Sequence, residues 1–146
     1  MTAKEYLQQY KDAVERARSA LEHLEELQSM ATRITPQYGG EGGGGQHQSG
    51  DAKLANAVDK IIEAKSRVSD ELEMLIATER EVVMTIDSIA DKTLSTLLYK
   101  RYVNCKTFEL IAVEMNYSYV HIVHRLHPKA LEAVKDVIEC NIQKDL

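Results

Sequence analysis

Basic and hydrogen-bonding side chains gather in one short part of the chain, between residues 100 and 129. Lysine and arginine bind phosphate oxygens, arginine also pairs with guanine, and hydroxyl or imidazole groups hydrogen-bond to bases or phosphates. This combination favours contact with DNA over catalysis. The candidate contact residues are Lys100, Arg101, Lys106, Thr107, Ser118, Tyr119, His121, His124, Arg125 and Lys129.

A helix-turn-helix would position these residues. Asp91 and Thr107 are caps suited to the first and second helices, and Ser118 can cap the third. Asn116 tolerates the left-handed backbone that the exit of the second helix needs. The helix from Ser118 would then enter the major groove. The apolar positions expected to face inward are Leu94, Leu97, Leu98, Tyr102, Phe108, Ile111, Ala112, Met115, Val123 and Leu126.

The local charge agrees with this prediction although the whole chain carries a net charge of -5. Residues 1–90 hold 10 Lys+Arg against 16 Asp+Glu, whereas residues 91–131 hold 6 basic and 3 acidic residues. The local sign governs contact with a phosphate backbone, because charges farther away are screened. We expect Lys100, Arg101, Lys106 and Lys129 to anchor phosphates, and Arg125 to be the best guanine reader.

Three segments of the C-terminal half resemble the helix-turn-helix of sigma factor region four. They are Leu98-Tyr99-x-Arg101-Tyr102, Ile111-Ala112-x-Glu114-Met115-x-Tyr117-Ser118 and Arg125-Leu126-His127-x-x-Ala130-Leu131. The chain is more closely similar to the small phage proteins of the ArpU/RinA-like transcriptional regulator group. Phage members of that group also look similar at Ala3-Lys4-Glu5-Tyr6-Leu7, Thr35-Pro36 and Ala57-Val58-x-x-Ile61.

The resemblance implies a phage or prophage regulator of transcription, often of late genes, in the cytoplasm of a bacterial host cell. Such a protein would bind double-stranded DNA and contact RNA polymerase. Two departures from the pattern stand out. The stretch from Ser118 to Ala130 is one residue longer than expected, and Pro128 falls where related proteins continue a helix. The third helix is therefore expected to end near His127, with Lys129 to Ile142 forming a separate or kinked helix.

Upstream, residues 1–90 are expected to form an antiparallel coiled-coil hairpin, with residues 91–146 as a separate DNA-binding domain. Two helices of roughly 30 and 38 residues would be joined by a flexible loop over 35–52, which contains all seven glycines. The second helix carries a seven-residue repeat of apolar residues. Its first position is Leu54, Ile61, Val68, Leu75, Val82 and Ile89, and its companion position is Val58, Lys65, Leu72, Glu79 and Ile86.

Each hairpin helix keeps an exposed apolar flank, which predicts a homodimer or a higher oligomer. A pair covered by the C-terminal helices is the alternative. On the first helix the seam is expected at Leu7, Tyr10, Val14, Ala17, Leu21 and Leu24. The fold class is thus all-α, a long helical hairpin followed by a helix-turn-helix.

Several other classes of function are disfavoured. No segment has the length and apolar character of a membrane span or of a signal peptide, and two cysteines are too few for a disulfide framework. His121, His124 and His127 drift around a helix and lack acidic or cysteine neighbours, so we expect no metal. No nucleophile or nucleotide motif is present, so neither an enzyme nor a cofactor is expected.

Two other functions remain open at this point. A phage DNA-packaging component of the small-terminase type also combines a helix-turn-helix with oligomerising arms. A protein-only adaptor that docks on RNA polymerase would use the same three-helix core without touching DNA.

Overall fold

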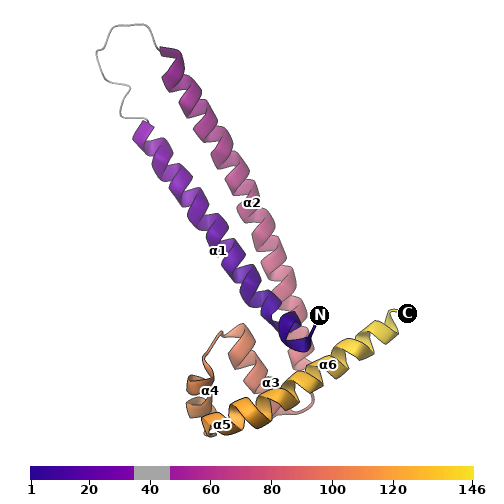
Figure 1. Ribbon diagram of the computed structural model, residues 1–146. Coiled ribbons are helices and arrows are strands. Elements are labelled where there is room, and N and C mark those ends of the chain that lie inside the picture. Colours follow the sequence, from indigo (N-terminus) through magenta and orange to yellow (C-terminus); the bar gives the residue numbers. More distant parts are fainter. Residues whose placement is uncertain (35–46) are drawn as a thin grey trace. The chain divides into compact units, whose positions relative to one another are not determined.

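The computed structural model describes residues 1–34 and 47–146 and is all-α in these ranges (Figure 1). Most of the predicted glycine loop lies outside the described residues. Its last part, from His47, belongs to a helix instead. The elements in chain order are α1 (Ala3–Ile34), α2 (His47–Asp87), α3 (Lys92–Leu98), η2 (Tyr99–Val103), α4 (Phe108–Met115), α5 (Tyr119–His121), η3 (Ile122–Leu126) and α6 (His127–Lys144).

Two compact units make up the chain, and their limits differ from the predicted division at residue 90. One unit consists of residues 15–74, and the other combines residues 1–14 with residues 75–146. The long helices α1 and α2 therefore each contribute to both units. The start of α1 and the end of α2 belong to the same unit as the helix-turn-helix.

α1 and α2 run alongside each other in opposite directions, as a helical hairpin requires (Figure 1). Near the ends of the hairpin the Tyr6 hydroxyl lies 2.9 Å from the Thr85 hydroxyl. Within the 15–74 unit, Ala17, Ala20 and Ala64 are buried. Short side chains at these positions allow two helix backbones to approach closely.

The predicted seam of α2 is correct at one heptad position and displaced at the other. All six residues of the first position are buried or half-buried, but Val58, Lys65, Leu72 and Glu79 of the companion position are exposed. The inward companions lie one residue earlier in the chain, where small residues such as Ala64 and Thr85 occur. On α1, Leu21 is likewise exposed while Ala20 is buried. The prediction weighted large apolar side chains, whereas close helix packing selects small ones.

The unit that combines residues 1–14 with 75–146, which we call the C-terminal unit, is built on a continuous apolar core. Its buried members come from the start of α1, the end of α2, and from α3, η2, α4, η3 and α6, whereas α5 contributes no buried residue. Asp91 caps α3 as predicted, because its carboxylate accepts from the backbone amides of Thr93 and Leu94 at 2.9 and 3.2 Å. The largest buried side chains of this core are Leu7, Val82, Ile86, Leu97, Leu98, Ile111, Ile122 and Val134.

None of the helices described over 1–34 and 47–146 combines the length and the apolar character that crossing a membrane requires.

Candidate nucleic-acid interface

The turn between α4 and α5 has the geometry that its sequence predicts. The Thr107 hydroxyl accepts from the Leu110 amide at 3.3 Å and begins α4. Asn116 ends the helix in the left-handed conformation, with φ 58°, and the Tyr117 amide donates to the Ala112 carbonyl at 3.0 Å. The Ser118 hydroxyl then accepts from the His121 amide at 3.1 Å. Thr107 and Ser118 are thus helix caps, which positions α5 tightly against α4.

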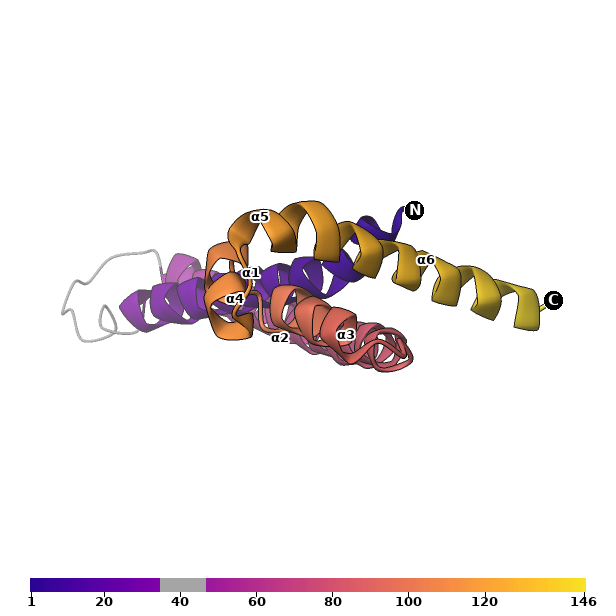
Figure 2. The same ribbon diagram turned by 90° about the horizontal axis from the view of Figure 1, so that it is seen from below.

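The helix that follows this turn does not end near His127, contrary to the prediction. α5, η3 and α6 follow one another without a break, and Pro128 lies in the first turn of α6 (Figures 1 and 2). We call this stretch, Tyr119–Lys144, the long C-terminal helix. The helix continues past Pro128 because of the backbone geometry of η3, the segment immediately before α6.

The segment η3 is π-helical, and the His127 amide donates to the Ile122 carbonyl five residues earlier. A π turn accommodates one extra residue and widens the backbone. The widening occurs where the ring of Pro128 would otherwise meet the carbonyl of the preceding turn.

One side of the long C-terminal helix packs into the core and the other is open. Ile122, Ala130 and Val134 are fully buried, while Val123 and Leu126, which were predicted to be inward, are half-buried. The π turn shifts the inward positions relative to a regular helix, so sequence reasoning missed Ile122. The open side carries Tyr119, Val120, His124, Arg125 and Lys129.

Three of the predicted contact residues on this open side have free polar groups. The side chains of His124, Arg125 and Lys129 have neither an ion pair nor a hydrogen-bond partner among the described residues. His121 is half-buried and stacks on Tyr117, with ring centroids 5.2 Å apart. That stacking fixes its ring at the turn.

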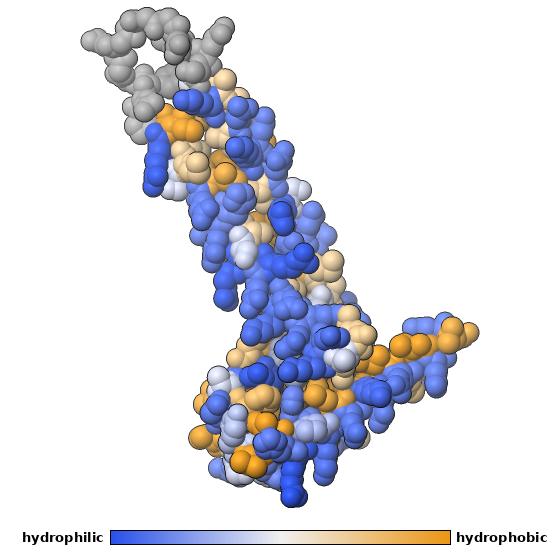
Figure 3. Space-filling model, in the orientation of Figure 1, coloured by the Kyte–Doolittle hydropathy of each residue, from blue (hydrophilic) through white to orange (hydrophobic). Residues whose placement is uncertain are grey.

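Val120 is an open-side residue that sequence reasoning did not select. It is 63% exposed in the first turn of the long C-terminal helix, beside Tyr119, which is 45% exposed. Leu110 and Val113 of α4 are also exposed, at 46% and 75%. Hydrophobic residues therefore reach the surface where α4 and α5 lie, at the lower left of Figure 3. The available signal was the position of Val120 directly after the predicted contact residue Tyr119, in the first turn that follows the cap.

Two predicted phosphate anchors are held by an acidic residue instead of standing free. The Lys100 and Lys106 ammonium groups lie 2.6 and 2.8 Å from the Glu114 carboxylate. Hydrogen bonds from Lys100 and Lys106 lower the pKa of Glu114, so this carboxylate stays charged. The three residues together keep one net positive charge on the surface shared by η2 and α4.

Arg101, another predicted anchor, is half-buried and contributes to the fold. Its guanidinium lies over the ring of Phe108, 4.1 Å from the centroid, and donates to the Lys106 carbonyl at 3.0 Å. Cys105 lies between Arg101 and Phe108 in the sequence and has a φ of 54°. This left-handed backbone conformation is unfavourable for most residues other than glycine and asparagine. The connection from η2 to α4 is therefore held by side-chain contacts that compensate for backbone strain.

His127 lies inside the core and is not available to a ligand. Its Nε2 is 2.8 Å from the Tyr102 hydroxyl, and the Phe108 ring meets its ring edge-on at 4.9 Å. Burial, with smaller effects from the positive charges of Arg101 and Lys4, lowers the pKa of His127 to about 4. Burial also raises the pKa of Tyr102. Both groups are therefore neutral near pH 7.

The three histidines that share the spacing i, i+3 and i+6 face different surroundings. His121 stacks on a tyrosine, His124 is exposed and His127 is buried. Over the described ranges, no group of three or more His, Cys, Asp or Glu side chains is placed to hold a metal ion.

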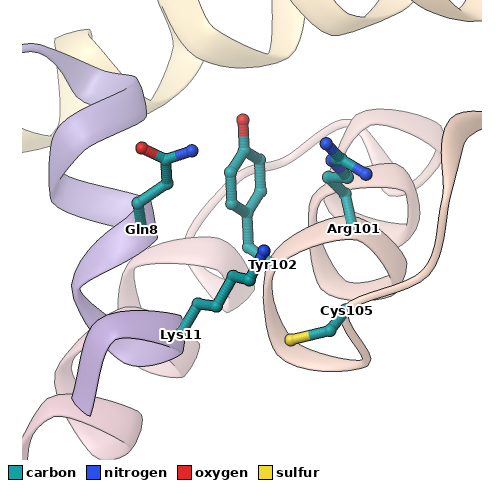
Figure 4. A pocket seen from close by; sticks show the side chains of 5 residues that line it. All are labelled: Gln8, Lys11, Arg101, Tyr102 and Cys105. Atoms are coloured by element: carbon teal, nitrogen blue, oxygen red, sulfur yellow. The ribbon is translucent and has the colours of Figure 1, made fainter. Parts of the chain in front are cut away.

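A small cavity lies beside Tyr102, lined by Gln8, Lys11, Arg101, Tyr102 and Cys105 (Figure 4). Its volume is about 50 Å³, which is room for a water molecule. An organic cofactor needs a pocket of roughly 300 Å³ or more, so this cavity does not hold one.

Comparison with known proteins gave no match to a family model, to a curated protein or to a solved structure.

Proposed function

We propose that the chain is a DNA-binding regulator of transcription, of the phage or prophage kind that its sequence resembles. The long C-terminal helix would enter the major groove with its open side toward the base edges. One observation carries this proposal. The capped turn at Asn116–Ser118 holds a helix whose inner side is anchored in the core and whose outer side presents His124, Arg125 and Lys129 without partners.

The chemistry of that open side suits a duplex. Arg125 can pair with guanine, and Lys129, four residues further along the helix, can bind a phosphate on the same face. His124 can hydrogen-bond to a base or a phosphate. Lys100 and Lys106 support contact less directly, because a phosphate must share them with Glu114.

Selection from a random DNA pool tests the proposal. The full chain is mixed with random duplexes at two stated salt concentrations, and bound fragments are sequenced over several rounds. Enrichment of one motif, with binding that weakens as salt rises, is expected. A pool that stays random, together with no gel shift on any enriched fragment, would exclude sequence-specific DNA binding.

Self-association through the hairpin is the second part of the proposal. Within the 15–74 unit, Val58, Ile62 and Leu72 are exposed on α2. Val58 and Leu72 are two heptads apart, and Ile62 follows Val58 by one helical turn, so the three lie along one side of the helix. A second copy would cover this apolar stripe and bring two C-terminal units to neighbouring half-sites, which strengthens weak single contacts. Sedimentation equilibrium of Ile62→Glu, compared with Asn56→Glu on the same helix, tests it. Loss of the dimer in the first variant alone is expected, and equal behaviour of both variants argues against it.

A protein-only adaptor for RNA polymerase is a second candidate function, favoured by one observation. Leu110 and Val113 are exposed on α4, and a partner protein that covered these apolar side chains would be stabilised by their burial. Retention of the chain on immobilised RNA polymerase, together with failure of the DNA selection, would support this function instead.

A further inference from the structure

We infer that Val120 reads the 5-methyl group of a thymine, so that the first turn of the long C-terminal helix selects a T·A pair. This inference rests on the proposed DNA binding and names what part of the site recognises. Thymine is the base that presents a methyl group in the major groove, and an apolar side chain is the group that recognises it.

The place of Val120 in the motif supports this role. It is the second residue after the Ser118 cap, and its side chain is 63% exposed. The first residues of the helix that follows the turn in a helix-turn-helix contact base edges. His124 follows four residues later, so that the two side chains lie on one helical face.

The neighbours of Val120 leave its side chain open to a ligand and hold the backbone of its helical turn in place. Tyr117 stacks on His121 beside it, and the Ser118 hydroxyl holds the His121 amide at 3.1 Å. A valine has one strongly preferred rotamer in a helix, so its two methyl groups are presented in a set direction. Little conformational entropy is then lost when a base methyl covers them.

The chemistry of the valine decides which base is chosen. Val120 cannot form a hydrogen bond, so it gains only from apolar contact, which thymine offers and cytosine lacks. Covering one methyl group is worth about a three- to fivefold change in affinity. Arg125, one turn further on, would read guanine by a charged contact of a different kind.

Deoxyuridine provides the test, because it differs from thymidine only in the absence of this methyl group. In the selected binding site, each thymidine is replaced singly by deoxyuridine, and the affinity of the full chain is measured by fluorescence anisotropy. We expect one replacement to weaken binding about three- to fivefold. In Val120→Ala the same replacement should cost less than twofold.

Val113→Ala is the matched control, because Val113 is also an exposed valine but lies on α4. It should keep the full effect of the sensitive deoxyuridine replacement. If no replacement affects the native chain, or if Val120→Ala keeps the full effect, the inference is wrong although DNA binding stands. If the selection yields no bound DNA, the proposed function fails first.

Discussion

Two groups of basic residues in the C-terminal unit have similar composition but different surroundings. The inner group, Lys100, Arg101, Lys106 and His127, is engaged by Glu114, Phe108 and Tyr102. The outer group, His124, Arg125 and Lys129, is exposed. Formal charge therefore overstates the basic surface, because several of its contributors stabilise the fold. In the proposed complex with DNA, the outer group is the part that contacts the duplex.

The largest expected effect concerns His127 of the inner group. Below pH 6.5 the unfolded chain takes up a proton that the folded chain, with a His127 pKa of about 4, does not accept. The free energy of unfolding should therefore fall as pH is lowered from 6.5 to 4, by up to about 3 kcal/mol from this residue. Urea denaturation over this pH range measures the loss.

His127→Gln is the control for that pH dependence, since glutamine keeps a polar partner for Tyr102 without titrating. Its stability should change less over the same range, because the group whose pKa folding lowers to about 4 is no longer present. An identical pH dependence in both proteins would show that His127 is not the group responsible.

Arg125 of the outer group is expected to affect binding and not folding. Arg125→Ala should weaken binding to the selected DNA by about 1–3 kcal/mol if it contacts a base. The free energy of unfolding should change by about 0.5 kcal/mol or less, as for other exposed sites. Anisotropy titrations and urea denaturation of the same variant measure both quantities. An equal loss of affinity for all sequences would instead assign Arg125 to a phosphate.

Arg101 should show the opposite behaviour. Arg101→Lys keeps the charge but removes the planar group that stacks on Phe108 and bonds to the Lys106 carbonyl. We expect the free energy of unfolding to fall by about 1–2 kcal/mol. Arg125→Lys, measured by the same thermal or urea melts, should be close to native. A similar loss of unfolding free energy in both variants would show that the arginines of the inner and outer groups do not differ in their contribution to the fold.

The smallest effect is expected at Glu114, which holds two cations of the inner group. Glu114→Gln should release Lys100 and Lys106 and raise DNA affinity about two- to fivefold, with a steeper dependence on salt. Glu109→Gln removes the same charge from an exposed position of α4 that no lysine contacts. If the two variants gain equally, the gain reflects net charge and not released lysines.

The parts of the fold set by short-range rules were predictable from sequence. Asp91, Thr107 and Ser118 cap the helices they were expected to cap, and Asn116 has the left-handed backbone. Each role depends on hydrogen bonds within a few residues, which sequence spacing reveals. The inward face of α4, at Ile111 and Ala112, was predictable for the same reason.

Features that depend on distant residues were not predictable. Glu114 lies 14 residues from Lys100, and nothing local shows that they pair. The π turns at η2 and η3 break the regular 3.6-residue period on which inward positions are assigned. Ala17 was predicted in the hairpin seam, but the other small residues, such as Ala20 and Ala64, were missed, because the distance between the helices and not hydrophobicity selects them.

The π turn at η3 sets the angle, about the helix axis, between the residues at the start of the long C-terminal helix and those in its later part. Its start is fixed by the Ser118 cap, and its later part is anchored by His127 and Ala130 in the core. Loss of one residue within η3 would rotate the first turn by about 100° against that anchor. A single-residue insertion or deletion can thus exchange the side chains displayed at one end while the buried end keeps its register. Such a scaffold can acquire a new exposed surface without altering a loop, provided that its core accepts another side chain in place of Ile122.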